Sequence, residues 1–272
     1  MPQNKPEYGF SSNDIPFVKW GNGGKVMLIF NGGPGNILPK GAGFRMMTAD
    51  FEPFVQTHTL YMIGRKRGLK NGVTTRDLSD DFAEMIKTDF GGRVDTVIGI
   101  SFGGMIAQHF AADHADCFKH LVIAIASHKM SEEGKNIDLD YARLIAGGEY
   151  RKGFLRLADA LSSKGIGRFL MKSMFWLFGG AMMKGDYDGY DRDIVLEAVA
   201  ETSHDAEDAL ARISVPVLII GGTRDVYFPL ESYEEMHAKI KNSILKIYVG
   251  RNHMNTMRDK RFAADVWEII RE

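Results

Sequence analysis

Short runs of apolar, largely β-branched residues recur along the chain, and stretches with a helical pattern separate most of them. The runs are KVMLIF (25–30), TLYMI (59–63), DTVIGI (95–100), HLVIAIA (120–126), VPVLIIG (215–221) and ILKIYV (244–249). Near-continuous apolarity is typical of strands that are covered on both faces, as in a parallel sheet. The pattern therefore predicts a mostly parallel central sheet.

Helical patterns with a mixture of apolar and charged positions follow several of these runs, at 74–90, 102–114, 230–240 and 258–272. This alternation predicts an α/β fold with helices on both faces of the sheet. We expect Thr75 to cap the first helix, and because Leu78 rather than Glu follows three residues later, its capping box is incomplete. The early segments EYGF and IPFVKW are expected to be antiparallel edge strands, since Pro16 suits an edge.

The alternation stops between about Ser131 and Asp208, where the chain becomes polar and then helical and methionine-rich. We interpret this region as a helical insertion that follows the sixth strand. The sequence thus predicts a core domain formed by 1–130 and 209–272, with a second domain at 131–208.

The composition fits a globular protein, with 44% hydrophobic and 25% charged residues. The formal net charge is −1 and no basic block stands out, which argues against nucleic acid as a partner. The single cysteine, Cys117, rules out an internal disulfide and fits a reducing compartment. Cys and His residues do not cluster at zinc-like spacing, so we expect no metal.

Two segments bear on location. The N-terminal stretch MPQNKPEYGFSSNDIPF is polar and does not resemble a secretory signal. The apolar stretch from Phe169 to Met183 is too short to span a bilayer and contains Lys172. We therefore expect a cytoplasmic protein without stable membrane association.

The segment GISFG (99–103) fits the pattern G-x-S-x-G and lies between a predicted strand and a predicted helix. Ser101 could simply be a helix N-cap. The alternative, which the context favours, is a nucleophile on a sharp turn that the small neighbours Gly99 and Gly103 permit. The helix N-terminus behind Ser101 would offer backbone N–H groups to a developing oxyanion.

A nucleophilic serine needs a base and a group that orients the base. Asp225 follows the strand VPVLIIG, and His253 follows the strand ILKIYV. Open parallel sheets gather their sites at the carboxyl ends of the strands, so we expect both residues at the same edge as Ser101. Either residue alone would more often be structural, but the order Ser, Asp, His is the one expected for this turn.

The glycine-rich segment NGGPGN (31–36) directly follows the strand KVMLIF. By itself it would be a tight turn. Beside a Ser-His-Asp triad, its backbone N–H groups can approach a ligand closely, because glycines lack a Cβ. We expect the N–H groups of Gly33 and Phe102 to form the oxyanion hole.

Together these motifs resemble those of the α/β-hydrolase fold superfamily, with GISFGG as nucleophile elbow, GGTRDVYFP as acid loop and GRNHMN as histidine loop. NGGPGN is similar to the H-G-G-P-G oxyanion loop of prolyl aminopeptidases. Here Asn31 replaces the usual histidine, and Phe102 stands where those enzymes tend to carry tryptophan. The segment 131–208 resembles the superfamily's helical cap. The resemblance implies hydrolysis of a small molecule without a cofactor.

The cap is where substrate choice is expected, and methionine and aromatic side chains form adaptable apolar walls. Candidate substrate-binding residues are Phe154, Phe169, Met174, Phe175 and Trp176, although most could equally pack the cap's own core. In the basic segment GRKRG (64–68), Lys66 and Arg67 suit a solvated turn. For Arg65 two interpretations remain, a solvated turn and contact with a carboxylate on the substrate.

The leading hypothesis is a serine hydrolase of small, mainly apolar esters or lactones. An alternative is an aminopeptidase that cuts N-terminal proline, which needs acidic cap residues to hold the substrate's ammonium. The unplaced candidates for that role are Glu149, Asp159, Glu197 and Glu201. Two further alternatives are a carbon–carbon bond hydrolase with the same triad and a non-catalytic small-molecule receptor.

Overall fold

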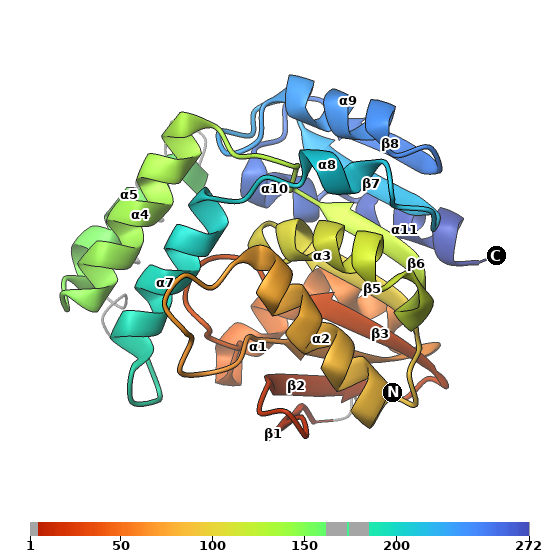
Figure 1. Ribbon diagram of the computed structural model, residues 1–272, viewed down its shortest axis with the longest axis horizontal. Coiled ribbons are helices and arrows are strands. Elements are labelled where there is room, and N and C mark those ends of the chain that lie inside the picture. Colours follow the sequence, from red (N-terminus) through yellow and green to blue (C-terminus); the bar gives the residue numbers. More distant parts are fainter. Residues whose placement is uncertain (1–4, 162–172, 174–184, 272) are drawn as a thin grey trace.

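An eight-stranded sheet forms the centre of the computed structural model, which describes residues 5–161, 173 and 185–271 (Figure 1). Its strand order is β1-β2-β4-β3-β5-β6-β7-β8. The strands are β1 (Glu7–Phe10), β2 (Pro16–Gly21), β3 (Lys25–Phe30), β4 (His58–Ile63), β5 (Val94–Ile100), β6 (Phe118–Ala124), β7 (Val217–Gly222) and β8 (Ser243–Tyr248). The pairs β1–β2 and β2–β4 are antiparallel and the remaining pairs are parallel. The predicted fold class is confirmed.

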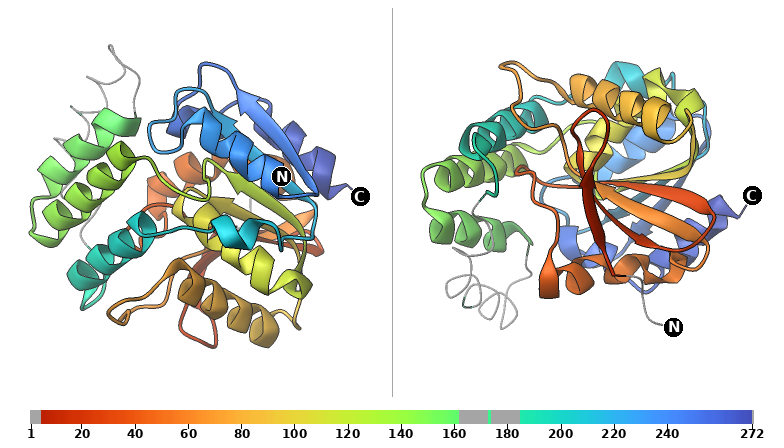
Figure 2. Two further views of the ribbon diagram at one scale, coloured as in Figure 1. Left: turned by 45° about the horizontal axis from the view of Figure 1, so that its top comes forward. Right: turned by 90° about the horizontal axis from the view of Figure 1, so that it is seen from below.

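Helices cover both faces of the sheet. They are α1 (Gly41–Thr48), α2 (Thr75–Asp89), α3 (Phe102–Asp113), α9 (Leu230–Lys239), α10 (His253–Met257) and α11 (Phe262–Ile270), with short 3-10 turns η1 (Ala49–Phe54) and η2 (Ala115–Cys117). Seen from below, the sheet runs between α2 on one side and α1 and α11 on the other (Figure 2).

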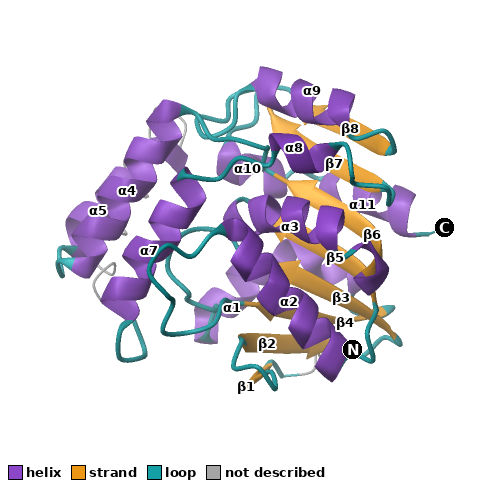
Figure 3. Ribbon diagram, viewed as in Figure 1, coloured by secondary structure: helices purple, strands orange, loops and turns teal. Residues whose placement is uncertain are grey.

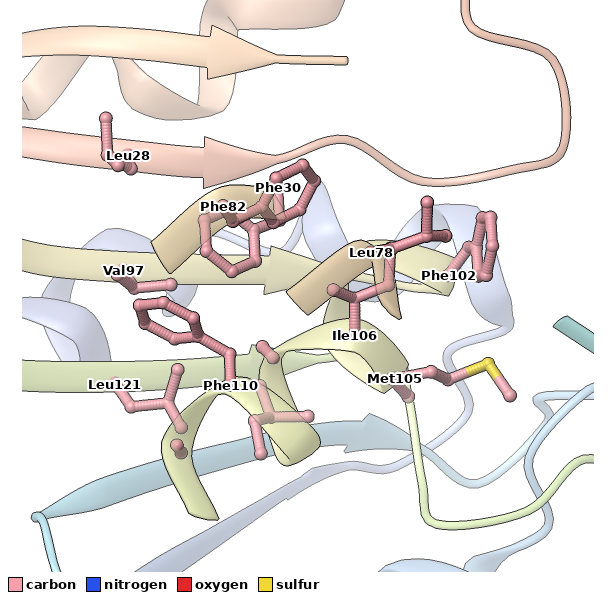
Figure 4. Packing of buried hydrophobic residues seen from close by; sticks show 14 of the residues in the cluster. Leu28, Phe30, Leu78, Phe82, Val97, Phe102, Met105, Ile106, Phe110 and Leu121 are labelled. Carbon is pink, nitrogen blue, oxygen red and sulfur yellow. The ribbon is translucent and has the colours of Figure 1, made fainter. Parts of the chain in front are cut away.

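Side chains of alternate residues on each central strand point to opposite faces of the sheet, which gives the fold two separate cores. On β5, Val97 packs toward α2 and α3, whereas Ile98 packs toward α11 and η1. The first core is centred on Phe30, whose ring lies 4.5 Å from that of Phe82 and 5.3 Å from that of Phe110 (Figure 4). Burial of strands on both faces explains the near-continuous apolar runs.

The segment between β6 and β7 contributes the helices α4 (Glu132–Ala146), α5 (Tyr150–Leu161), α7 (Tyr190–Thr202) and α8 (Glu207–Leu210). Figure 3 shows α4, α5 and α7 side by side at the end of the sheet toward which the arrows of the parallel strands β3 to β8 point. Tyr141 and Ile145 of α4 share a small core with Ile194 of α7. By contrast, Leu210 of α8 belongs to the first core of the sheet.

Two helix boundaries differ from the prediction. The N-cap of α2 is Thr74 rather than Thr75, and its partner three residues later is Asp77, so the capping box is complete. Thr75 instead turns inward, where its hydroxyl lies 2.8 Å from Nδ1 of His204. The last helix begins at Phe262 rather than 258, after a turn in which the Asp259 carboxylate accepts hydrogen bonds from Arg261.

Replacing Thr74 with Ala should lower the free energy of unfolding by about 1 kcal/mol, because the N-cap hydroxyl accepts the N–H of Asp77. Urea denaturation measures the change. Thr88→Ala in the last turn of α2 is the matched control, since Thr88 bonds only the carbonyl of Glu84 one turn earlier. Equal losses of unfolding free energy in the two variants would show that the N-cap hydrogen bond stabilises the helix no more than an ordinary hydroxyl contact does.

Candidate active site

Ser101 occupies the turn between β5 and α3 with φ 51° and ψ −120°. Positive φ is unfavourable for a residue with a Cβ and is typically maintained by the surrounding structure. Here the Ser101 N–H donates to the carbonyl of Ala124 on β6, and the Ser101 carbonyl accepts from Gly104 and Met105. The backbone is therefore fixed on both sides of the strained residue.

Glycines allow this turn to form because backbones approach closely there. A Cβ on Gly103 would lie 2.0 Å from the carbonyl oxygen of Phe30, and one on Gly99 would lie 2.6 Å from Cα of Gly104. A Cβ on Gly32 would lie 3.1 Å from Cβ of Ser101. The glycine-rich segment after β3 thus runs directly beside Ser101.

The structure brings Ser101, Asp225 and His253 together from the segments that follow β5, β7 and β8. Nδ1 of His253 lies 2.8 Å from Oδ2 of Asp225, and Nε2 lies 3.0 Å from Oγ of Ser101. Because an ionised carboxylate can only accept, Nδ1 carries the proton and Nε2 is left as an acceptor for the Ser101 hydroxyl. These contacts have the geometry that a nucleophile, its base and a group that orients the base require.

Both carboxylate oxygens of Asp225 have hydrogen-bond partners. Its Oδ1 accepts from the backbone N–H groups of Tyr227 and Phe228 at 2.9 and 3.3 Å. Its Oδ2 also accepts from the hydroxyl of Tyr233 on α9 at 3.1 Å, and Gly221 leaves room for this ring beside β7. Sequence reasoning missed Tyr233, because a tyrosine in an amphipathic helix has the pattern of a core residue.

The two expected oxyanion donors belong to segments that adjoin Ser101, because Phe102 follows it in the chain and a Cβ on Gly32, next to Gly33, would lie 3.1 Å from its Cβ. Phe102 opens α3, so its N–H is among those without an acceptor inside the helix. Gly33 has φ 68°, a conformation that favours glycine. Asn31 bonds within its own loop, donating its side-chain amide to the carbonyl of Ile37 at 3.3 Å.

Lys66 is half-buried and pairs with Asp81, and Arg67 is exposed and pairs with Asp186. Arg65, by contrast, is buried. Its guanidinium forms a two-pronged ion pair with Glu197 of α7, with Nε and Nη2 each 2.9 Å from a carboxylate oxygen. Burial alone would lower the pKa of Arg65, but the charge and hydrogen bonds of Glu197, together with other acidic groups nearby, outweigh this and hold the pKa above its ordinary value. The carboxylate that Arg65 meets belongs to the protein.

A second carboxyl lies buried in the same region, one turn further along α7. Glu201 is hydrogen-bonded to Asp138 of α4, and Asp138 accepts from the hydroxyl of Tyr227 at 3.1 Å. Burial, followed by the charge of Asp138, raises the pKa of Glu201 well above its usual range, so the pair shares a proton. Tyr227 connects the pair to the site, because its ring lies 4.7 Å from that of His253.

The other predicted residues fall in different places. Phe154 is buried on α5, with its ring 6.4 Å from that of Tyr141. Phe169, Met174, Phe175 and Trp176 lie outside the described residues, as does the side chain of Asp159. Glu149 is partly exposed and pairs with Lys152. Asp138 is an acidic residue that the sequence analysis did not select, since nothing local distinguishes it from other polar residues of α4.

The described part of the chain contains no group of His, Cys, Asp or Glu side chains that could hold a metal ion. Within those same residues, no helix is both long enough and apolar enough to cross a membrane.

Comparisons with known proteins agree on the fold. Residues 57–259 match the family described as "alpha/beta hydrolase fold". Similar solved structures include MGS-M2, an alpha/beta hydrolase enzyme from a Medee basin deep-sea metagenome library, with a TM-score of 0.77 at 18% identity, covering 95% of this chain and 94% of the other. No curated protein sequence matches the chain.

Two further structures resemble the whole chain. The enol-lactonase of Burkholderia xenovorans gives a TM-score of 0.75 at 16% identity, and the alignment covers 98% of this chain and 100% of the other. The esterase of Exiguobacterium antarcticum gives 0.72 at 16% identity with the same coverage. At this identity the likeness shows the fold alone.

Replacing Glu201 with Gln should change how stability depends on pH. Because the pKa of Glu201 is raised in the folded protein, folding takes up a proton above the ordinary carboxyl pKa, and this lowers the wild-type free energy of unfolding as pH rises. The variant lacks this uptake. Its stability relative to wild type should therefore increase as the pH rises above about 5, by up to about 1.4 kcal/mol per pH unit.

Thermal or urea unfolding at several pH values measures this difference. Glu149→Gln is the matched control, because it makes the same chemical change in a partly exposed carboxylate of the same helical segment. If both variants differ from wild type with the same pH slope, the buried and protonated state of Glu201 is contradicted.

Proposed function

The chain belongs to the alpha/beta hydrolase fold family, and on that premise we propose that it is a serine hydrolase that cleaves small, mainly apolar carboxylic esters or lactones through an acyl-enzyme on Ser101. One observation carries the proposal: the continuous chain of contacts from Asp225 through His253 to Ser101, at 2.8 and 3.0 Å. These distances lie within the hydrogen-bond reach that a nucleophile and its base require.

In the first half of the reaction, Nε2 of His253 takes the proton of the Ser101 hydroxyl while Oγ attacks the substrate carbonyl. Asp225 holds the imidazole in the required tautomer and stabilises the positive charge that the ring acquires. The carbonyl oxygen becomes an oxyanion that accepts from the N–H groups of Gly33 and Phe102. The tetrahedral intermediate then expels the alcohol, which receives the proton from His253.

In the second half, a water molecule replaces the alcohol. His253 removes a proton from the water as its oxygen attacks the acyl-enzyme, and the same N–H groups bind the new oxyanion. Ser101 leaves with the proton from His253, which restores the starting state and releases the carboxylic acid. Every group in this cycle belongs to the chain, the substrate or water.

The ester class is supported by the likeness to an esterase and an enol-lactonase over almost the entire chain. We further propose that 131–208 acts as a cap domain on a core formed by 1–130 and 209–272. In this proposal, apolar side chains of the cap contact the acyl or alcohol part of the substrate. The position of α4 and α7 beyond the strand ends, beside the loops that carry the triad, supports this role.

A second candidate is an aminopeptidase that cleaves N-terminal proline, and the carboxyl pair of Asp138 and Glu201 favours it. Glu197 and Glu149 are already paired with Arg65 and Lys152, which leaves Glu201 as the described acidic candidate without a basic partner. One oxygen of Glu201 is buried without a hydrogen-bond partner among the described residues. A substrate ammonium could replace the shared proton.

Replacing Ser101 with Ala should abolish turnover of p-nitrophenyl esters of short acids, with a fall in kcat of at least about 10⁴-fold, because the attacking oxygen is lost. A fluorophosphonate probe should label the wild type stoichiometrically and label neither Ser101→Ala nor His253→Ala, as read by mass spectrometry. Ser12→Ala is the control, since Ser12 bonds Asp89 on α2. If the folded wild type takes no label and hydrolyses no ester, the serine hydrolase proposal is wrong.

Glu201→Gln distinguishes the two candidates. If the chain is an aminopeptidase, the wild type cleaves a proline arylamide, and the variant loses at least about tenfold in kcat/KM on it while ester cleavage changes little, because an ammonium loses its charged partner. If it is an esterase, the wild type cleaves the aryl ester and not the arylamide. Steady-state kinetics on both substrates separates these outcomes.

A further inference from the structure

The loop that follows β3, residues 31–37, is held by side chains from two distant parts of the chain. Arg65 comes from the core, just after β4, and Glu197 comes from α7 in the inserted segment. The side chains are 0% and 1% exposed, respectively. Such a buried ion pair requires that the remaining donors and acceptors also find partners.

Arg65 uses its remaining donors on the carbonyls of this loop. Nη1 donates to the carbonyl of Asn31 at 3.0 Å, and Nη2 donates to the carbonyl of Gly33 at 3.0 Å. The N–H of Gly33 belongs to the peptide that lies between these two carbonyls. The guanidinium is planar and its donors stand in a rigid fork, so the two hydrogen bonds restrict the direction of the Gly33 N–H.

Glu197 holds the same loop at a further position. Its Oε2, which accepts from Nη2 of Arg65, also accepts from the N–H of Gly35 at 2.7 Å. A Cβ on Gly35 would lie 2.8 Å from the Tyr190 hydroxyl and 3.1 Å from Cδ1 of Ile194. Since both of these residues are on α7, the helix lies directly against the loop.

The same guanidinium also reaches the second expected donor. Its central carbon lies 5.2 Å from the ring centroid of Phe102, the residue that follows Ser101. Arg65 thus contacts both residues that would bind the oxyanion, through loop carbonyls in one case and through an aromatic ring in the other.

From these contacts we infer that Arg65 is a positioning residue for the oxyanion hole, and that Glu197 makes the geometry of the hole depend on the seating of α7. The inserted segment then does more than cover the site, because its contact with the core aligns the Gly33 N–H. This inference rests on the proposed serine hydrolase function. Neither residue touches the reacting atoms, so the predicted effect is on the rate of the chemical step.

A purely structural role for the ion pair is the alternative, and α7 contains a matched control. Asp193, one turn before Glu197, also has a side chain that is 1% exposed, and it accepts from the N–H groups of Gly68 and Leu69 at 2.6 and 3.0 Å. It therefore fastens the same helix to the core without touching the loop 31–37. Asp193→Asn loosens α7, whereas Glu197→Gln loosens both α7 and the loop.

The test compares the two variants on an oxygen ester and on the matching thionoester. Glu197→Gln should lower kcat on the ester by about 10- to 100-fold with KM changed by less than about threefold, because misaligned donors weaken only transition-state binding. Its preference for the ester over the thionoester should fall by about tenfold, since sulfur accepts hydrogen bonds poorly. Asp193→Asn should keep the wild-type kcat and preference even where it lowers Tm.

Glu197→Asp is the second variant in case Glu197→Gln does not fold. It keeps the buried charge balanced, but its shorter side chain cannot reach both Arg65 and Gly35, so it should show the same loss of kcat and preference. The inference is overturned if folded Glu197 variants keep the wild-type kcat and preference. It is also overturned if Asp193→Asn shows an equal loss, because general loosening of α7 would then suffice.

Hydrogen exchange followed by mass spectrometry separates this inference from the proposed function. Peptides that cover 31–37 should exchange faster in Glu197→Gln than in wild type, and should exchange at the wild-type rate in Asp193→Asn. If the wild type shows no turnover that depends on Ser101, the proposed function is wrong, yet exchange still tests whether Arg65 and Glu197 hold the loop 31–37. Unchanged exchange of these peptides in Glu197→Gln would overturn the inference that Glu197 holds the loop.

Discussion

The close approach of three backbones around Ser101 is the constraint on which the site depends. Ser101 has φ 51° because β5 must turn at once into α3, and Gly103 must lie against the carbonyl of Phe30 on β3. This arrangement brings the side chain of Ser101, the first N–H groups of α3 and the loop after β3 to one point. The parallel sheet then delivers Asp225 and His253 to the same edge, because both follow neighbouring strands.

Buried charge makes the contact between the inserted segment and the core specific. An unpaired buried charge is costly, so Arg65 on the core side requires Glu197 on α7 in one position. Asp138 and Glu201 meet the same requirement differently, by sharing a proton beside Tyr227. Apolar contacts alone tolerate sliding between helices, whereas these polar groups are satisfied in one register. The two clusters therefore fix where α7 and α4 stand relative to the triad.

Features that leave a local pattern could be predicted from the sequence, and pairings between distant residues could not. Apolar runs identified the strands, and the glycines around Ser101 indicated the turn. The order of Ser101, Asp225 and His253 pointed to residues that lie in hydrogen-bond contact. The partner of Arg65 lies 132 residues away, and periodicity contains no trace of such a pair. The N-cap of α2 was misplaced by one residue because Thr74 and Thr75 are chemically alike.

Residues 125–216 connect β6 to β7, and these two strands are direct neighbours in the sheet, with Leu121 opposite Val217. For the sheet, this long segment is only a connection whose ends already lie side by side. The entropy of closing such a connection grows slowly with its length. Insertions and exchanges between its helices therefore leave the strand register and the Ser101 turn untouched. A change within the segment that moves α7, by contrast, reaches the loop 31–37 through Glu197.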